Sequence, residues 1–319
     1  MRPAPDWTGR SLLHVLPFNG IRTETVFALD MIAHLDGYQH TVMMVGWPAQ
    51  ADNTLVRGFL LAGARVFHVC EQSLRRLEET QRYSAAVLWN VPFDVEFDAP
   101  TVFWSYGPEP AGAPGRELTL GPQYTDWRHL PPALQTRRMR GICGMRHKSD
   151  AFSVALMSSD ADGRFPTALA AALAEGLPQD VMLYLTDVPC WQKSVSRQTG
   201  LIPLTLDGAL SGCANADAVV YAHARGFLER GGRLGLECMA SGVPVLARTG
   251  TAIAGCFPED GEQLLLFDGS DELLRRIEWL RSHRKEGRRM GERAQLAVSR
   301  YDISIHVGAM KRALRTLGA

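Results

Sequence analysis

Two glutamates around a pair of glycines are the residues of this sequence whose types and spacing could do chemistry. Glu229 and Glu237 lie eight residues apart, and Gly231 and Gly232 lie between them. A carboxylate can accept two hydroxyl hydrogen bonds at once, which suits the vicinal diols of sugars and riboses. Glycines let a diphosphate approach the main chain, and the N–H groups that begin a helix favour anions. Phosphate-binding amides between two diol-binding carboxylates describe a nucleotide-sugar site.

The elements that must position this motif are a strand, a glycine loop, a helix and a second strand. A buried strand is expected at 218–221, the glycines stand in a polar loop before a short helix, and the next strand opens at Pro244. Such a unit places the glycine loop where the first strand ends and the helix begins. The same alternation of apolar runs with helix-period segments extends along the whole chain, which is typical of parallel sheets wound by crossover helices.

The alternation predicts two sets of strands and helices. The first set has strands at 11–17, 40–45, 65–69, 85–89 and 101–104, with helices at 23–35, 54–64 and 73–83. The second set has strands at 152–157, 181–185, 218–221, 244–247 and 263–267, and the chain is helical after Asp268. We therefore expect an α/β fold of two doubly wound parallel sheets. Open parallel sheets bind ligands outside the carboxyl ends of their strands, so the site is expected between the two domains.

The domain boundary is placed by the breaks in this alternation. A length of 319 residues favours two domains, because single cores stop growing well around 250 to 300 residues. Residues 106–123 are rich in proline and glycine and are expected to form one long loop. A basic stretch follows, and the alternation restarts at Phe152. The predicted domains are an N-terminal one over 1–148 and a C-terminal one over 149–300.

Composition and cysteine usage narrow the function classes. Lys plus Arg and Asp plus Glu both total 34, so no overall field gathers nucleic acid. The six cysteines are scattered without a CxxC pair, which favours a reducing compartment. The apolar run before Asn19 is too short for a signal core or a membrane span. We expect a cytoplasmic protein, with peripheral contact at the inner face of the membrane left open.

The glutamate motif resembles that of the glycosyl transferases group 1 family. The typical segment of that family reads Glu-Gly-x-Gly-x-x-x-x-Glu-Ala-Met-Ala-x-Gly-x-Pro-Val, and the segment here reads ERGGRLGLECMASGVPV. Both glutamates keep their spacing and the second glycine is in place. The other matching positions are Met239, Ala240, Gly242, Pro244 and Val245. The family consists of retaining enzymes with the GT-B architecture, in which two Rossmann-like domains enclose a cleft. The resemblance covers about 152–317 and implies this architecture for the chain.

The resemblance also implies roles for residues at the matching positions. It implies that Glu229 contacts the donor sugar and that Glu237 contacts the nucleotide ribose. The donor-binding set comprises Glu237, Gly231, Gly232, Arg233, Gly250, Thr251, Asn19 and Gly20. Gly250 and Thr251 follow the second strand and would offer further amides to the phosphates. The last helix, within 301–319, is expected to return to the N-terminal domain.

Two positions depart from the family pattern. The family carries an Arg and a Lys after the first strand of the C-terminal domain. Here Ser158 or Ser159 falls near the Arg position and Arg164 near the Lys position, so one cation would serve for two. Where many relatives present a His in the N-terminal domain, this chain has Tyr106, whose phenol can still hydrogen-bond a sugar hydroxyl. The expected catalytic set is Glu229, Arg164 and Tyr106.

The expected activity is transfer of a sugar from a nucleoside diphosphate sugar, with UDP or GDP as the nucleotide, to an acceptor hydroxyl with retention of configuration. No cofactor and no metal are expected, and the acceptor is a glycan, a glycolipid or a small molecule. His14 and His223 lie in or just after apolar strands without a second metal-ligand type at metal spacing, so we interpret them as core or rim histidines. Two alternatives stay open: a degenerate GT-B protein that binds a nucleotide or partner without turnover, and a nucleotide-sugar epimerase.

Overall fold

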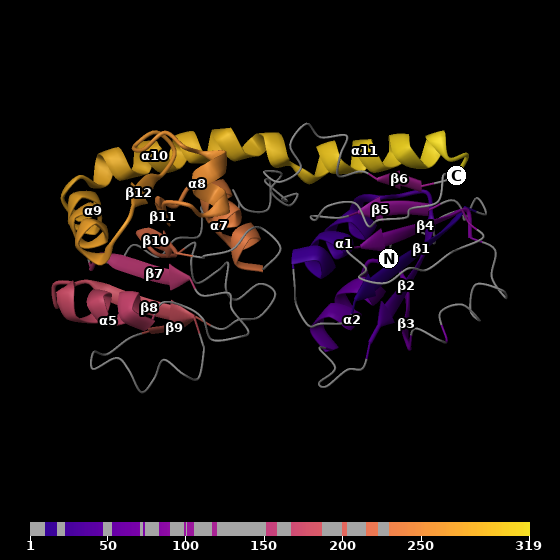
Figure 1. Cartoon of the computed structure of the whole chain (residues 1–319), viewed down its shortest axis with the longest axis horizontal. Helices are drawn as coiled ribbons and strands as arrows, with labels where there is room; N and C mark the ends of the chain where they lie inside the picture. Colours follow the sequence, from indigo (N-terminus) through magenta and orange to yellow (C-terminus); the bar gives the residue numbers. More distant parts are fainter. Residues whose placement is uncertain are drawn as a thin grey trace. The chain divides into compact units, whose positions relative to one another are not determined.

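The chain forms two compact units (Figure 1), one of Met1–Leu130 with Ile303–Ala319 and one of Pro131–Asp302. The computed structural model describes residues 10–17, 23–46, 53–70, 73, 83–89, 99, 101–104, 117–119, 151–157, 167–186, 200–202, 215–222 and 230–319. The boundary expected after residue 148 lies outside these residues. Each unit is built on one parallel sheet, and each is described by itself below.

The first unit contains a six-stranded parallel sheet in the order β3-β2-β1-β4-β5-β6. Its strands are β1 Ser11–Pro17, β2 Gln39–Val45, β3 Arg65–Val69, β4 Ala85–Trp89, β5 Thr101–Trp104 and β6 Glu117–Thr119. The connecting helices within the described residues are α1 Thr23–His34 and α2 Asn53–Leu61. The central strand β1 is an apolar run buried on both faces, as expected for the middle of a parallel sheet.

The two faces of β1 carry different chemistry. Leu13 and Val15 pack with Met43 and other buried apolar side chains on one face. Successive side chains of a strand point to opposite faces, so His14 points to the other face. Thr41, which pairs with Leu13 in the strand register, is a buried polar residue on the first face, and His14 lies at the centre of the other face.

The last helix, α11 Ile303–Thr316, packs against α1 in the first unit. His306 meets the edge of the Phe27 ring, with the ring centroids 5.4 Å apart. Lys311 Nζ lies 2.6 Å from Asp36 Oδ1, and this hydrogen bond and charge lower the pKa of the Asp36 carboxyl. An apolar stripe together with one ion pair thus holds the end of the chain on the first unit.

The second unit contains a six-stranded parallel sheet in the order β12-β11-β10-β7-β8-β9. Its strands are β7 Ser153–Met157, β8 Met182–Thr186, β9 Gly200–Ile202, β10 Ala218–Tyr221, β11 Val245–Arg248 and β12 Leu265–Phe267. Its helices within the described residues are α5 Thr167–Gly176, α7 Arg230–Ala240, α8 Ala252–Cys256, α9 Ser270–Ser282, α10 Arg284–Ala297 and the 3-10 helix η2 Val298–Tyr301. The sheet has a core on each face: α7, α8 and η2 cover one, α5 and α9 cover the other, and α10 contributes Ala294 to the first core and Met290 to the second.

The predicted architecture of two doubly wound parallel sheets, the GT-B type, is confirmed, whereas the expected cleft between the domains stays a prediction. One prediction was wrong in part: residues 106–123 are not a single loop, because Glu117–Thr119 form β6 and pair with β5. The strand β9 was not predicted either. Both are three-residue strands at a sheet edge, and three positions are too few to show the alternation of a strand.

Candidate functional site

The strand order of the second unit locates a ligand-binding edge. From β7 the chain builds outward through β8 to β9, then returns to place β10 on the other side of β7 and builds outward again through β11 to β12. The connections therefore reverse direction between β7 and β10. In doubly wound sheets ligands bind outside the carboxyl ends of the strands at this reversal. Ala222, which directly follows β10, lies at that edge.

Helix α7 begins at this same edge. At its other end, Gly242 adopts a φ of 77° and donates its N–H to Met239 O at 2.9 Å, and the chain enters β11 three residues later. Because β11 enters the sheet at the amino edge, α7 ends at that edge and runs antiparallel to the strands. Its 11 residues span about 16 Å. The first turn of α7, Arg230–Arg233, is consequently on the carboxyl side.

A close approach between Gly235 and its neighbours sets the position of α7. A Cβ placed on Gly235 would lie 2.2 Å from Ile253 Cδ1 and 3.0 Å from Tyr221 Cδ2. A larger residue at this position would have to displace the side chain of Ile253, so glycine allows α7 to pack closely on β10 and α8. Leu236 and Met239 then fill the core beneath the helix. The helix start is thus fixed relative to the sheet by packing behind it.

Glu237 lies on this buried half of α7. Its exposed fraction is 8%, and the residues from Gly235 to Ala240 are all buried. It stands seven residues after Arg230, which places it about 10 Å along the helix axis. A carboxylate at such a position is costly unless polar groups surround it.

The turn after β11 is the second part of the edge. Gly250 has a φ of 79°, in the left-handed region that favours glycine. Thr251 caps α8: its Oγ1 accepts from Ala254 N at 3.4 Å and donates to Arg248 O at 2.8 Å. The Thr251 N–H also donates to Arg248 O, at 3.2 Å. The donors of Thr251 are therefore used inside the turn.

Gly250 has the room for a ligand that Thr251 lacks. A Cβ built on Gly250 meets nothing within 4 Å. Among the hydrogen bonds between described residues, none uses the Gly250 N–H. Of the two residues predicted to bind phosphate in this turn, Gly250 is the one with an amide left to donate.

The structure places part of the predicted site. Gly231, Gly232 and Arg233 lie in the first turn of α7, where the sequence had suggested a loop for the glycines. The loop prediction was wrong because the helix already begins at Arg230, and its first N–H groups are those of the glycine pair. Glu237, Gly250 and Thr251 are placed as described above. The predicted residues Glu229, Arg164, Tyr106, Asn19 and Gly20 lie outside the described residues, so their roles stay predictions.

A polar chain in the first unit was not foreseen. Trp89 Nε1–H donates to His14 Nδ1 at 3.2 Å, His14 Nε2 lies 2.9 Å from His40 Nδ1, and His40 Nε2 lies 2.9 Å from Leu35 O. The indole can only donate, so His14 Nδ1 accepts and both imidazoles are neutral with the proton on Nε2. Only the strand register shows this chain, because its members are far apart in sequence.

Burial controls the protonation of these histidines. His14 is fully buried, which confirms its interpretation as a core histidine; His223 lies outside the described residues. Burial, and then the neighbouring His40, hold the pKa of His14 well below its usual range. Burial also lowers the pKa of His40, although its hydrogen bond to Leu35 O opposes this. The hydrogen-bonded network of Trp89, His14 and His40 is satisfied inside the core. Neither of its imidazoles is ready to act as an acid-base catalyst near neutral pH.

The described residues contain neither a candidate metal cluster nor a membrane-spanning helix. Within the described ranges, no group of three or more His, Cys, Asp and Glu side chains could hold a metal ion. No described helix has both the length and the apolar character needed to cross a bilayer. Independence from metal stays a prediction.

The site segment matches a known family. Residues 222–306 match the family described as glycosyl transferase-like. This match confirms the resemblance that the glutamate motif indicated, and its range includes α7 and the Gly250 turn. No protein with a curated description matches the chain by sequence.

Solved structures share the fold of nearly the whole chain. HepE from Anabaena, solved with UDP and glucose, is 14% identical with a TM-score of 0.69, covering 96% of this chain and 100% of that one. Sucrose-phosphate synthase from Thermosynechococcus elongatus is 12% identical with a TM-score of 0.65, covering 97% and 99%. A protein assigned as a UDP-N-acetylglucosamine 2-epimerase from Listeria monocytogenes is 10% identical with a TM-score of 0.60, covering 91% and 94%. At these identities the likeness establishes the fold.

Proposed function

Because residues 222–306 match the family described as glycosyl transferase-like, we propose that the chain transfers a sugar from a nucleoside diphosphate sugar to an acceptor hydroxyl. One observation carries the proposal. The first turn of α7 and the Gly250 turn both follow strands at the carboxyl edge of the sheet, beside the reversal between β7 and β10. Two sets of main-chain donors at this edge suit a diphosphate.

The phosphates are the part of the donor that these amides would bind. The first N–H groups of a helix have no partner within the helix, and the helix dipole adds a partial positive charge. The Gly250 N–H supplies a further donor. As the sugar departs, negative charge grows on the diphosphate, and donors fixed in advance stabilise that charge without rearranging. Arg164 would add one cation to this set.

The carboxylates would bind the two ends of the donor. Glu237 is proposed to accept hydrogen bonds from the ribose hydroxyls, and its burial would strengthen them by excluding water. Glu229 is proposed to contact the donor sugar, and Tyr106 to hydrogen-bond a sugar hydroxyl. Because HepE was solved with UDP, UDP is the first nucleotide to test and GDP the second.

The remaining parts of the proposal rest on the family resemblance. Retention of configuration and independence from metal are proposed because the group 1 enzymes work in this way. The acceptor, a glycan, a glycolipid or a small natural product, is proposed to bind the N-terminal unit near Asn19, Gly20 and Tyr106. We propose a cytoplasmic reaction, with peripheral membrane contact where the acceptor is a glycolipid.

A thermal-shift titration with UDP, GDP and the matching nucleosides tests donor binding. A ligand that binds only the folded state stabilises it by about 2.7 kcal/mol at 100 times its Kd, so the bound diphosphate should raise Tm progressively. A panel of nucleotide-sugars that carry the preferred nucleoside diphosphate is then tested as donors with EDTA present. Release of the nucleoside diphosphate is measured. No Tm shift with any diphosphate at millimolar concentration would overturn the proposal.

Two other functions give different results in the same assays. A degenerate protein is favoured by two departures from the family pattern: Arg164 is one cation where the family has two, and Tyr106 stands where many relatives have a His. Such a protein would show a Tm shift with UDP but would neither hydrolyse nor transfer the sugar. The shared fold of the Listeria protein favours an epimerase, which would change the sugar without any acceptor. Chromatography of the sugar products with and without acceptor separates the three.

A further inference from the structure

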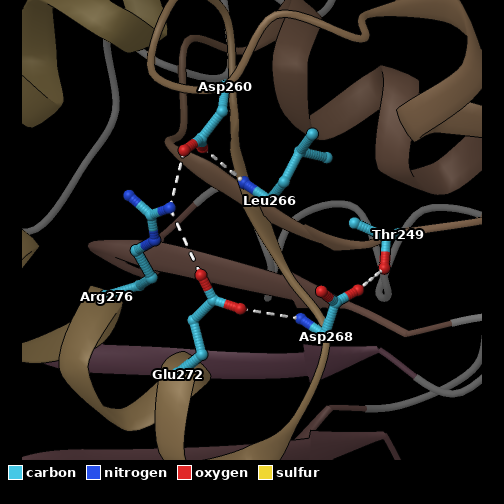
Figure 2. A network of polar contacts seen from close by, with 6 residues as sticks. All are labelled: Thr249, Asp260, Leu266, Asp268, Glu272 and Arg276. Carbon is cyan, nitrogen blue, oxygen red and sulfur yellow. Dashed lines mark hydrogen bonds and ion pairs between the residues drawn. The ribbon is translucent and has the colours of Figure 1, made fainter.

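A network of polar side chains fastens the Gly250 turn to the neighbouring strand (Figure 2). Thr249, the first residue after β11, donates its Oγ1 hydrogen to Asp268 Oδ1, and Asp268 is the first residue after β12. The Thr249 N–H donates to Phe267 O at 3.0 Å. Thr249 is therefore held to the end of β12 by its main chain and by its side chain.

The same network continues into helix α9. Asp268 N–H donates to Glu272 Oε2 at 3.0 Å (Figure 2). Arg276 Nη2 lies 2.6 Å from Asp260 Oδ2 and 3.4 Å from Glu272 Oε1. Asp260 Oδ1 in turn accepts from Leu266 N at 2.8 Å. Asp268 is thus held by the first turn of α9, which is itself anchored to the strand beside it.

The residue that follows Thr249 is the one with an available amide. Gly250 adopts a left-handed φ and has open space around it, and the hydrogen bond from Thr251 N–H to Arg248 O closes the turn across Thr249 and Gly250. The peptide plane that carries the Gly250 N–H also carries the carbonyl of Thr249. Restraint of Thr249 at its N–H and its hydroxyl therefore restrains the direction of the Gly250 N–H.

We propose that Asp268, acting through the Thr249 hydroxyl, is a positioning residue that orients the Gly250 N–H toward the diphosphate of the nucleotide. This inference rests on the proposed function. Asp268 does not touch the ligand: it holds the turn in the geometry that binds it. A hydrogen-bond donor that is already held in the binding geometry binds more tightly, because binding then costs no further conformational entropy for ordering the donor.

The charge of Asp268 separates this role from direct ligand binding. The negative charge of a carboxylate does not help to bind a diphosphate. If Asp268 only holds the turn, its amide can therefore replace it. Asp268→Asn keeps an acceptor oxygen for the Thr249 hydroxyl, and UDP affinity should stay within about twofold of wild type. An acid that accepted hydrogen bonds from the donor sugar would lose donor affinity with this substitution.

The test measures Kd for UDP and for uridine by calorimetry on the full chain. Thr249→Val and Asp268→Ala should each weaken UDP binding about fivefold, the effect of one lost hydrogen bond, and leave uridine binding unchanged. Thr249→Ser keeps the hydroxyl and should restore UDP affinity. The double variant should bind UDP about fivefold more weakly than wild type in total, and not 25-fold more weakly, because both changes break the same interaction.

A second ion pair on the same helix provides the matched control. Arg281 lies 2.7 Å from Asp180 and is not part of the network, so Arg281→Ala should leave both affinities unchanged. Thermal unfolding of every variant confirms that the second unit is folded. If wild-type protein binds UDP and Thr249→Val binds it equally well, the positioning role is overturned while the proposed function stands. If wild-type protein binds neither UDP nor GDP, the proposed function fails and the positioning role fails with it.

Discussion

The two sheets have the same strand order but use their polar groups differently. The central strand of the first unit carries His14, and three side chains from β1, β2 and β4 form a hydrogen-bonded chain inside the core. The central strand of the second unit has only apolar side chains from Val154 to Leu156; Ser153 at its amino end is hydrogen-bonded to Asp217, and the polar groups of the candidate site lie at the carboxyl edge. One topology thus accommodates an internal polar network and an external one.

The difference lies in what completes the hydrogen bonds. In the first unit the protein completes them, because the chain from Trp89 to Leu35 O leaves both imidazoles satisfied. In the second unit the first-turn amides of α7 have no partner within the helix, and no hydrogen bond between described residues uses the Gly250 N–H. Changes in the internal network should therefore alter folding, and changes at the edge should alter binding or rate.

The largest expected effect is that of His14→Leu on the stability of the first unit. Leucine fills most of the space but leaves Trp89 Nε1–H and His40 Nδ1 without their partner. Two unpaired buried groups cost about 1–3 kcal/mol each, so the free energy of unfolding should fall by about 3 kcal/mol. Hydrogen exchange of peptides from β1 should accelerate strongly, whereas peptides from β10 should be unchanged.

A fully apolar replacement distinguishes lost hydrogen bonds from lost packing. The triple variant His14→Leu, His40→Leu, Trp89→Phe leaves no side chain of the network unpaired and should recover at least half of the lost stability. A triple variant less stable than His14→Leu alone would show that packing dominates, and the contrast between the two sheets would then be one of shape.

A rate effect of nearly the same size is expected from Glu229→Ala. If Glu229 contacts the donor sugar, its loss should lower kcat about 100-fold, or roughly 2.7 kcal/mol, with UDP affinity changed by less than threefold. Glu262→Ala serves as the control, because Glu262 is an exposed acid of the same unit that pairs with Arg293 at 3.6 Å. Equal loss of kcat in both variants would remove the assigned role.

The sequence predicted the central strands better than the contacts between them. β1 and β10 have the predicted bounds, because a buried parallel strand is a continuous apolar run between polar turns. The three-residue edge strands β6 and β9 show no such run. Which residues meet across strands depends on register and helix packing: His14 and Trp89 are 75 positions apart, and Thr249 and Asp268 are 19 apart. The glutamate motif was visible only because all its parts are local.

Glu237→Ala should weaken UDP binding about tenfold, or roughly 1.4 kcal/mol, with a smaller change in kcat at saturating donor. The reason is that ribose contacts are made equally in the ground state and the transition state. Glu237→Gln keeps one acceptor oxygen and should fall between alanine and wild type. Calorimetry with UDP and single-turnover rates separate affinity from chemistry, and unchanged affinity in Glu237→Ala would leave the site without its ribose ligand.

The smallest effect is a pH dependence confined to the first unit. The pKa of His14 and that of His40 are lowered on folding, whereas in the unfolded chain both lie near 6.5. Above about pH 7 neither state binds the proton, so these groups do not alter stability there. Below pH 6.5 the unfolded state binds protons that folded His14 does not, and the free energy of unfolding falls. The loss from His14 alone between pH 6.5 and 5.5 is about 1 kcal/mol.

Hydrogen exchange at these two pH values, corrected for the intrinsic exchange rate, should show this loss in β1 and not in β10. The triple variant should lack it, because the titrating groups are gone. If β10 loses as much protection as β1 in the wild-type protein, the two units do not unfold separately. The internal network would then stabilise the whole chain, and the division between a folding role and a binding role would no longer follow the division into units.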